Sequence, residues 1–246
     1  MTNHRPLALI TGVGRRISIG TAIARQLAGD GWDIAFSNYR PDPGFEAEFR
    51  RELEGLGART FSAETDLADP AAPAELVRDV AAELGPITAL VTSHAQSVDS
   101  SIHDTTIESF DLHFAINTRA NWLLIKEFAR QYSSAPGLGR IVALTSDHTT
   151  HNLPYGASKG ALDRIVIAAA GELGNLGITA NLINPGPVDT GWISPELGAE
   201  LGSQTALGRL GTQQDAANLV AFLLSERGGW INGQLLHSNG GFHLAV

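Results

Sequence analysis

The sequence predicts an α/β fold, a doubly wound, parallel, seven-stranded sheet with helices on both faces. Short apolar runs alternate with longer amphipathic segments at a spacing of roughly 25 residues, which is typical of strand–helix–strand units with right-handed crossovers. The apolar runs are rich in aliphatic and β-branched residues, as in strands buried on both faces. Because no Pro-, Gly- or Ser-rich linker and no internal repeat divides the 246 residues, we expect one domain over residues 1–246.

Seven short apolar runs are the predicted strands of this sheet. In chain order they are Leu7–Thr11, Asp33–Asn38, Arg59–Glu64, Ile87–Val91, Arg140–Thr145, Thr179–Asn184 and Gln234–His237. In a doubly wound sheet, ligands bind beyond the carboxyl ends of the strands. We therefore expect the site residues directly after these runs.

Amphipathic patterns between the strands predict the covering helices. They fall near residues 20–30, 45–56, 73–84, 106–133, 155–174 and 212–225. In the second of them, Phe45, Phe49 and Leu53 recur at helical spacing, charged residues occupy the other face, and Gly57 follows as a stop. The helices at 106–133 and 155–174 are apolar beyond one stripe, which indicates contact with a partner subunit as well as with the sheet.

The composition argues against several classes of function. The net charge of −9 and the pI near 5.3 disfavour binding to nucleic acid or to an anionic membrane surface. Cysteine is absent, which excludes disulfides and thiolate ligands, and we predict no metal site. The apolar run near the N-terminus is too short for a signal peptide or a membrane span, so we expect a soluble, cytoplasmic protein.

The segment TGVGRRISIGTAIA (Thr11–Ala24) joins the first predicted strand to the first helix, which is where a phosphate-binding turn belongs. Gly12 permits a tight turn and a close approach of the backbone to a pyrophosphate. Ser18 is placed to cap the helix, whose free N–H groups and positive dipole end attract an anion. The glycine spacing does not match G-x-G-x-x-G, and an ordinary strand-to-helix turn is the alternative interpretation.

The residues after the second strand indicate which dinucleotide binds. NAD sites usually carry Asp or Glu there, to bind the ribose 2′-hydroxyl. In this chain the segment SNYRPDP places there Asn38, Tyr39 and Arg40. With Arg15 and Arg16 in the opening loop, guanidinium groups are available for a 2′-phosphate, so we predict NADP, with NAD still possible if Asp42 reaches the ribose. After the third strand, Asp66 and Leu67 are placed to hold the adenine.

Tyr155 and Lys159 lie four residues apart at the start of a predicted helix and therefore share one face. An ammonium group beside a phenol stabilises the phenolate, so we expect the pKa of Tyr155 to fall below its usual value of about 10. This makes Tyr155 a candidate proton donor or acceptor. Ser146 ends the preceding strand, where its hydroxyl can polarise a carbonyl, and Asn117 lies in mid-helix, where asparagine is unfavourable. An exposed pair without function is the alternative.

Taken together, the motifs resemble those of the short-chain dehydrogenase/reductase family over nearly the whole chain. In order, they are TGVGRRISIG, TDL, FAIN, LTS, YGASK, NPGPVDTGW and WINGQLLHSNGG. The resemblance implies a Rossmann fold, a homotetramer or homodimer, and hydride transfer between a nicotinamide cofactor and a carbon that bears oxygen.

The resemblance also implies a role for each matching residue. Tyr155 is then the general acid/base, and Ser146 orients and polarises the carbonyl. Lys159 binds the nicotinamide ribose and lowers the pKa of Tyr155, and Asn117 binds a water that links Lys159 to solvent. Further contacts with the cofactor are implied for Ser18, Ile19, Ser93, His94, Pro185, Gly186, Val188 and Thr190.

Three departures from the family pattern stand out. In place of Asn-Asn-Ala-Gly after the fourth strand, the chain reads TSHAQS, which begins with Thr92, Ser93, His94 and Ala95. Ser146 and Tyr155 are only nine residues apart, so DHTTHNLP between them is a shortened active-site loop, and Thr145 is an alternative to Ser146. The opening loop resembles that of enoyl-ACP reductases, whereas the spacing of Tyr155 and Lys159 resembles that of ketoreductases.

The histidines near the predicted site have two interpretations. His94, His148 and His151 either touch the substrate or make ordinary polar contacts, and no carboxylate stands at ligand spacing beside them. Trp192 begins a segment that we interpret as a lid, and its ring either covers the nicotinamide or packs against the lid's own base.

We therefore predict an oxidoreductase that transfers a hydride between NADP(H) and a carbonyl or secondary alcohol, with a 3-oxoacyl thioester or a small ketone as substrate. An enoyl thioester reductase is the alternative enzyme, favoured by the opening loop. A catalytically silent NADP-binding regulator is the alternative from another class, against which the set Asn117, Ser146, Tyr155 and Lys159 argues.

Overall fold

The computed structural model describes residues 5–191 and 193–242. Seven strands form one parallel sheet in the order β3-β2-β1-β4-β5-β6-β7. They are β1 (Leu7–Thr11), β2 (Asp33–Asn38), β3 (Thr60–Glu64), β4 (Ala89–Thr92), β5 (Gly139–Leu144), β6 (Ile178–Asn184) and β7 (Leu235–His237). The predicted fold class is confirmed, and the chain reverses direction across the sheet between β1 and β4, where doubly wound folds bind their ligands.

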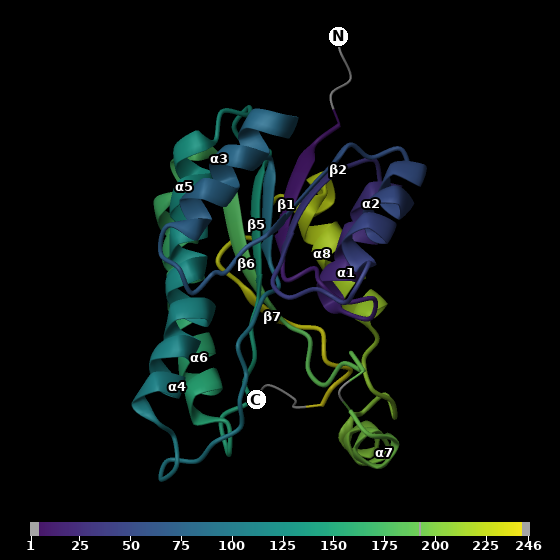
Figure 1. The fold of residues 1–246 in the computed structure, drawn as a ribbon, viewed down its shortest axis with the longest axis vertical. Coiled ribbons are helices and arrows are strands. Elements are labelled where there is room, and N and C mark those ends of the chain that lie inside the picture. Colours follow the sequence, from purple (N-terminus) through teal and green to yellow (C-terminus); the bar gives the residue numbers. More distant parts are fainter. Residues whose placement is uncertain (1–4, 192, 243–246) are drawn as a thin grey trace.

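Helices cover both faces of the sheet (Figure 1). One layer contains α1 (Ile19–Gly29), α2 (Phe45–Gly55) and α8 (Gln213–Leu224). The other contains α3 (Ala72–Leu84), α4 (Ile107–His113), α5 (Ala120–Gln131) and α6 (Leu153–Glu172). The short 3-10 helices η2 (Gly174–Leu176) and η3 (Glu226–Gly228) precede β6 and follow α8.

Burial on both faces explains the apolar strands. Along β1, Ala8 and Ile10 pack into the cluster that faces α1, α2 and α8, while Leu7 and Leu9 pack into the cluster that faces α3, α5 and α6. All five residues of β1 are buried, as are all six of β2. The side chains of β1 and β2 alternate between two cores, which explains their mostly apolar sequence, whereas the edge strands β3 and β7 are only partly buried.

The helix predicted at 106–133 is present from Ile107 to Gln131, but it is not a regular α-helix throughout. It consists of α4, a π-helical turn η1 (Phe114–Arg119), and α5. Asn121 Nδ2 donates to the backbone carbonyl oxygen of Asn117 at 2.8 Å. In a regular α-helix this oxygen would accept from the backbone N–H four residues later, so the side-chain bond accompanies the wider turn. The wider turn places Asn117 inside the protein, fully buried.

The segment after Asp189 contains a helix, α7 (Pro195–Gln204), which the amphipathic pattern did not predict. Ser194 caps it by accepting from the backbone N–H of Leu197 at 3.2 Å, and Pro195 occupies the first turn. In Figure 1 it lies beyond the edge of the sheet, below α1 and α8. Only one of its residues, Gly202, is buried, which is why no apolar stripe reveals it.

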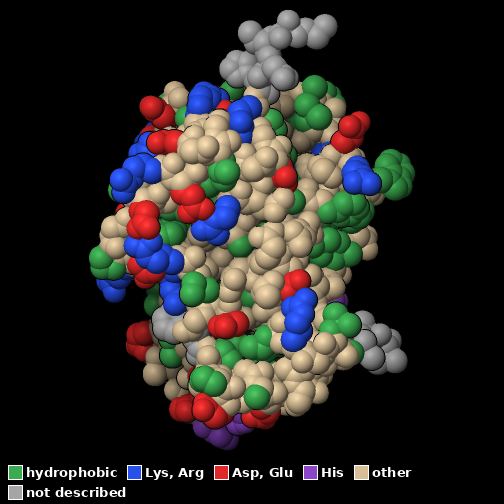
Figure 2. Space-filling view, turned by 90° about the vertical axis from the view of Figure 1, so that its right-hand side faces the viewer, with side chains coloured by type: hydrophobic (Ala, Val, Ile, Leu, Met, Phe, Trp, Pro, Cys, Tyr) green, Lys and Arg blue, Asp and Glu red, His purple; other side chains and the backbone are tan. Residues whose placement is uncertain are grey.

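The face formed by α1, α2 and α8 carries mixed charge rather than a single sign (Figure 2). Arg25 on α1 pairs with Glu52 on α2, and Arg50 pairs with Glu54 one helical turn away. These exposed pairs account for the charged side of α2 that the sequence pattern indicated.

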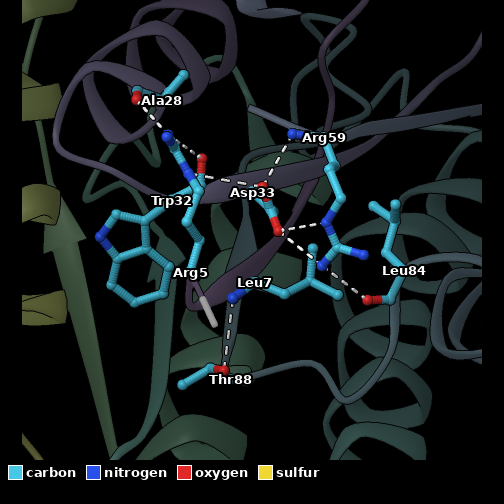
Figure 3. Close-up of polar contacts among 8 residues, drawn as sticks. All are labelled: Arg5, Leu7, Ala28, Trp32, Asp33, Arg59, Leu84 and Thr88. Atoms are coloured by element: carbon cyan, nitrogen blue, oxygen red, sulfur yellow. Dashed lines mark hydrogen bonds and ion pairs between the residues drawn. The ribbon is translucent and has the colours of Figure 1, made fainter. Parts of the chain in front are cut away.

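A buried carboxylate holds the amino-terminal edge of the sheet together (Figure 3). Asp33, only 1% exposed, accepts from the backbone N–H and from Nε of Arg59, both at 2.8 Å, and lies 3.6 Å from Nε of Arg5. Arg5 in turn donates to the carbonyl oxygens of Ala28 and Trp32 at 2.9 and 3.1 Å. Asp33 therefore ties β2 to the N-terminal segment and to the start of β3, at the edge opposite the carboxyl ends of the strands.

Replacing Asp33 with alanine should lower the free energy of unfolding by about 1.5–3 kcal/mol, because Arg59 would lose its charge-assisted hydrogen bonds and Arg5 its ion pair, although both guanidinium groups are partly exposed to solvent. Denaturant unfolding followed by circular dichroism measures this. The control is Asp79→Ala, which removes an exposed pair with Arg78 and should change the stability little. Equal effects of the two substitutions would contradict the role given to Asp33.

Candidate active site

A cavity of about 500 Å³ opens at the carboxyl ends of the central strands. It is bounded by the opening loop, the ends of β2, β4 and β5, the first turns of α6, and the segment after β6. The predicted site residues that line it are Gly12, Arg15, Ser18, Ile19, Asn38, Asp66, Leu67, Ser93, His94, Tyr155, Lys159, Pro185 and Thr190. The fold thus brings residues from nearly the whole chain to one place.

The remaining predicted residues lie around this cavity without lining it. They are Arg16, Arg40, Asn117, Ser146, Gly186 and Val188. Conversely, Gly14, Gln96 and Ile116 line the cavity and were not predicted. Gln96 lies in the segment that replaces the usual motif after β4, and no motif in the sequence singles it out. Ile116 reaches the cavity from the π-helical turn, which the sequence pattern does not reveal.

The opening loop has the geometry of an anion site. Gly12 has φ +78°, and a Cβ there would lie 2.6 Å from the backbone nitrogen of His94, so only glycine fits. Ser18 caps α1 as predicted, because its hydroxyl accepts from the backbone N–H of Thr21 at 3.1 Å. Thr21 Oγ1 donates to the carbonyl oxygen of Arg15 at 2.6 Å, which folds the loop over the helix start. The N–H groups of the first turn face the cavity end of the sheet, where an anion is favoured.

The end of β2 offers a hydrogen-bond acceptor. Asn38 is buried, and its Nδ2 donates to Glu46 Oε2 at 2.9 Å. Its Oδ1 has no hydrogen-bond partner among the described residues, although the residue lines the cavity. A buried acceptor of this kind is costly unless a bound group donates to it.

The predicted arginines differ in their placement. Arg16 pairs with Glu48 on α2 at 2.6 Å, and its backbone N–H donates to Asp42, which holds that carboxylate against the loop. Arg40 has φ +49°, and its guanidinium lies 5.0 Å from the ring centroid of Tyr39. Only Arg15 lines the cavity, and it extends toward Gly191.

Tyr155 and Lys159 project from the first turns of α6 into the other end of the cavity. Lys159 is 2% exposed, and its Nζ donates to the carbonyl oxygen of Leu144 at 2.7 Å. Burial lowers the pKa of Lys159 to about 8, while the charge of Asp163 acts in the opposite direction. Lys159 Nζ lies 5.8 Å from the centre of the Tyr155 ring.

The expected lowering of the Tyr155 pKa is wrong for this structure. Burial raises the pKa of Tyr155, and the hydrogen bond with the Ser146 hydroxyl only partly opposes that increase. The ammonium of Lys159 donates its hydrogen bond to the carbonyl oxygen of Leu144 at the end of β5. The structure nevertheless brings Ser146 and Tyr155 into hydrogen-bond contact, and the Ser146 hydroxyl also accepts from the backbone N–H of His148 at 3.1 Å. The catalytic roles implied for the two residues stay predictions.

Asn117 ties three segments together. Its Oδ1 accepts from the backbone N–H of Gln96 at 2.8 Å, and its Nδ2 donates to the Gln96 carbonyl oxygen at 2.8 Å and to Ser158 Oγ at 2.9 Å. The π-helical turn, the loop after β4 and helix α6 are thereby held in register beside the cavity. The water-binding role implied for Asn117 stays a prediction.

His94 is a buried link between the central strands and the π-helical turn. Its Nδ1 lies 2.6 Å from Thr11 Oγ1, and its Nε2 lies 3.1 Å from the carbonyl oxygen of Ile116 and 3.2 Å from Asn121 Nδ2. Burial and the nearby charge of Lys159 lower the pKa of His94 to about 3, so the ring is neutral at physiological pH. His148 and His151, by contrast, are exposed and do not line the cavity.

The short segment between β5 and α6 is held to the loop after β4. Asn152 pairs with Ser100 in a parallel bridge and donates from Nδ2 to Ser97 Oγ at 3.1 Å. The backbone N–H of Ser100 donates to the carbonyl oxygen of His151 at 3.0 Å. A Cβ on Gly156 would lie 2.4 Å from the carbonyl oxygen of His148, so the segment lies tightly against the first turn of α6.

The segment after β6 forms the last wall. Gly186 has φ +63° and packs against Asn239, and Val188 pairs with Gly211 in a parallel bridge, so both support the wall from behind. Trp192, the predicted start of the lid, lies outside the described residues. Within residues 5–191 and 193–242 there is no cluster of three or more His, Asp or Glu that could hold a metal ion, and no helix long and apolar enough to cross a membrane.

Comparison with known proteins defines the class. A family model described as Enoyl-(Acyl carrier protein) reductase matches residues 12–243. The chain is 38% identical to the uncharacterized oxidoreductase YjdA of Bacillus subtilis, over 98% of both chains. It is 34% identical to an NADPH-dependent aldehyde reductase-like protein, chloroplastic, of Arabidopsis thaliana, over 96% of this chain and 93% of that one.

A solved structure agrees with these relatives. A short chain dehydrogenase from Burkholderia cenocepacia in complex with NADP superimposes with a TM-score of 0.89 at 32% identity, over 96% of this chain and 97% of that one. The chain belongs to the short-chain dehydrogenase/reductase family of oxidoreductases, which confirms the resemblance seen in its motifs.

The buried, neutral His94 makes stability fall in acid. The unfolded imidazole titrates near pH 6.5 and the folded one at about 3, so below pH 6.5 the unfolded state binds a proton that the folded state does not. The stability contributed by His94 is therefore present above pH 6.5 and is lost as the pH falls. Between pH 7 and pH 5 we expect a loss of about 2 kcal/mol from this group.

Urea unfolding at both pH values measures this loss in the wild type and in His94→Asn, and the variant should lack it. His103→Asn, at an exposed histidine, is the control and should keep the wild-type pH dependence. The same pH dependence in the wild type and in His94→Asn would contradict a buried, neutral ring.

Proposed function

We propose that the protein is an NADP(H)-dependent carbonyl reductase, which also runs in reverse on a secondary alcohol, with Tyr155 as the proton donor and acceptor. The observation that carries this proposal is the hydrogen-bonded pair of Ser146 and Tyr155 beside the buried ammonium of Lys159, at one end of the cavity. These three groups are the ones that a carbonyl oxygen needs when it becomes a hydroxyl.

The cavity fits a dinucleotide. Gly12 has no side chain, so a pyrophosphate can approach the backbone there. The capped start of α1 favours an anion. Asn38 Oδ1 is a buried acceptor that a bound group could satisfy by donating a hydrogen bond. The absence of an acidic residue at the end of β2 supports NADP, as do the Burkholderia cenocepacia structure with NADP and the NADPH-dependent relative of Arabidopsis thaliana. NADP(H) would supply the hydride or accept it, as the cofactor does throughout nicotinamide chemistry.

The protein's own groups handle the proton. Because burial raises the pKa of Tyr155, the phenol is protonated at neutral pH and can donate to the carbonyl oxygen, which suits the reductive direction. The Ser146 hydroxyl shares that hydrogen bond and orients the oxygen. Lys159, charged below its pKa of about 8, stabilises the phenolate that remains.

The substrate class is an aldehyde or ketone, with 3-oxoacyl thioesters as one candidate. An enoyl thioester reductase is the second candidate, because the matching family model carries that description and the opening loop resembles those enzymes. The four-residue spacing of Tyr155 and Lys159 supports the ketoreductase. Assembly of Asn117, Ser146, Tyr155 and Lys159 around one cavity argues against a silent regulator.

We also propose that two or four copies of the chain associate. Ile107 at the start of α4 is 76% exposed and Trp122 on α5 is 50% exposed, on the helices that the sequence pattern marked as too apolar for one buried stripe. Light scattering in dilute solution would then give a multiple of the 26.0 kDa chain mass.

Tyr155→Phe should lower kcat by about 100- to 10,000-fold while NADPH still binds, because only the proton donor is removed. NADPH oxidation is followed with a panel of aldehydes, ketones, 3-oxoacyl thioesters and enoyl thioesters, and binding by NADPH fluorescence. Tyr132→Phe, whose hydroxyl donates to Ala135 away from the cavity, is the matched control and should stay active. Turnover of enoyl thioesters alone would favour the second candidate, and wild-type activity in Tyr155→Phe would remove Tyr155 from its role.

Replacing Arg15 and Arg16 together with alanine should raise the KM for NADPH about tenfold and the KM for NADH much less, because only NADPH carries the 2′-phosphate. Steady-state kinetics with both cofactors measures the difference, and the single variants separate Arg15 from the Glu48-paired Arg16. Arg25→Ala, which removes a guanidinium paired with Glu52 outside the cavity, is the control. An equal change for both cofactors would mean that the two arginines do not select NADP.

A further inference from the structure

Helix α6 holds the end of β5 at two consecutive residues. Lys159 Nζ donates to the carbonyl oxygen of Leu144 at 2.7 Å. Asp163, four residues further along the same face of α6, accepts from Thr145 Oγ1 at 2.5 Å. Ser146 is the next residue along the chain, so the position of its hydroxyl depends on this double attachment.

The bond to Asp163 also decides between two candidate hydroxyl groups. Thr145 is buried and donates its hydroxyl proton to the carboxylate, so it has no proton left to polarise a substrate carbonyl. Ser146 Oγ accepts from a backbone N–H and contacts the Tyr155 phenol. The alternative in which Thr145 replaces Ser146 therefore loses its chemical basis.

Asp163 lies where its charge matters. It is half-buried and forms no direct ion pair with any of the described residues. Burial raises the pKa of Asp163, and Thr145, Lys159 and Arg164 oppose that increase. In return, the carboxylate raises the pKa of Lys159 against the effect of burial. The aspartate and the lysine thus stabilise each other's charged forms.

We propose that Asp163 is a positioning residue for the reaction: it fixes Ser146 through Thr145, and its negative charge keeps Lys159 protonated beside Tyr155. The proposal rests on the function proposed above for Ser146, Tyr155 and Lys159. A half-buried carboxylate one helical turn from Lys159 has an effect that a neutral hydrogen-bond acceptor lacks, because its charge raises the proton affinity of its neighbours.

The sign of the effect follows from electrostatics. A negative charge makes every nearby group hold its proton more tightly, so its removal lowers the pKa of both Lys159 and Tyr155. These two groups titrate as a coupled pair, so the pH profile reports a shared apparent pKa. On α6 itself, the only other charge that acts on Asp163 is Arg164.

Other ionisable groups on the elements near this pair have hydrogen-bond partners of their own. His94, at the end of β4, has its pKa lowered to about 3 and stays neutral over the assay range. His113 lies on α4, which packs against α6. Its Nε2 accepts a hydrogen bond from the backbone N–H of Val98, and its Nδ1 lies 2.6 Å from the carbonyl oxygen of Ser109. Arg119 in the π-helical turn donates to the carbonyl oxygen of Ala68 in the segment after β3.

The test separates the charge from the hydrogen bond. Asp163→Asn keeps an acceptor oxygen for Thr145 and removes the charge, whereas Thr145→Val removes the hydrogen bond and keeps the charge. In Asp163→Asn, the midpoint of the pH profile of kcat/KM should move down by about 0.5–1 pH unit. In Thr145→Val, kcat should fall while the midpoint stays at its wild-type value, and Asp163→Glu should also keep that midpoint.

Glu172→Gln is the matched control, because it removes an exposed carboxylate at the far end of the same helix. It should leave both the activity and the midpoint unchanged. A shift in Glu172→Gln equal to that in Asp163→Asn would overturn the proposal, since any carboxylate on α6 would then suffice. An unchanged midpoint in a folded, NADPH-binding Asp163→Asn would overturn it as well.

Two further measurements keep the result decisive. Asp163→Ser is a second neutral variant, with a small polar side chain. Thermal unfolding shows which of the two neutral variants is folded, and the pH profile of that variant tests the proposal. The ultraviolet absorbance of the phenolate, taken as the difference between each protein and its Tyr155→Phe version, follows the same titration without turnover. If Tyr155→Phe keeps full activity, the proposed function fails; if it is inactive and the phenolate midpoint ignores Asp163, only this inference fails.

Discussion

The burial of one ammonium group is the constraint on which the active end of the cavity depends. Lys159 is 2% exposed, and removing a charge from water is costly unless partners compensate. The carbonyl oxygen of Leu144 and the charge of Asp163 are those partners. Both bind α6 to the end of β5, which places Tyr155 and Ser146 from the two elements within hydrogen-bond contact.

A second network positions the other side of the cavity. His94 joins the ends of β1 and β4 to the π-helical turn, and Asn117 joins that turn to Gln96 and to α6. Every bond in this network is made by a neutral group, so it does not alter with pH over the physiological range, whereas the bonds of Lys159 involve a charge. The site therefore combines a rigid neutral frame with one pair of groups that titrates.

Local patterns were enough to predict most of the fold. The bounds of β1 and β2 agree with the predicted strands at every residue, because burial on both faces leaves a continuous apolar signal. The π-helical turn within the helix predicted at 106–133 was missed, because the bond from Asn121 to the Asn117 carbonyl oxygen depends on a side chain rather than on periodicity. Helix α7 was missed because it buries almost nothing.

The site was predictable where a motif fixes it and unpredictable where a partner is distant in the chain. The motifs placed Tyr155, Lys159 and Gly12 at the cavity. Nothing near Arg16 in the sequence indicates that Glu48 would hold it, and nothing near Tyr155 indicates that burial would raise its pKa. Asp163 was overlooked for the same reason, since its partner Thr145 belongs to another element.

The central claim is that this cavity carries out carbonyl reduction with the proton supplied by Tyr155. The most direct test is hydride tracing, in which NADPH deuterated at the transferable position is turned over with each substrate that the protein accepts. Mass spectrometry and proton NMR of the product locate the deuterium. The account predicts one deuterium on the carbon that bears the new hydroxyl; deuterium on a former double-bond carbon, with the carbonyl intact, would contradict it.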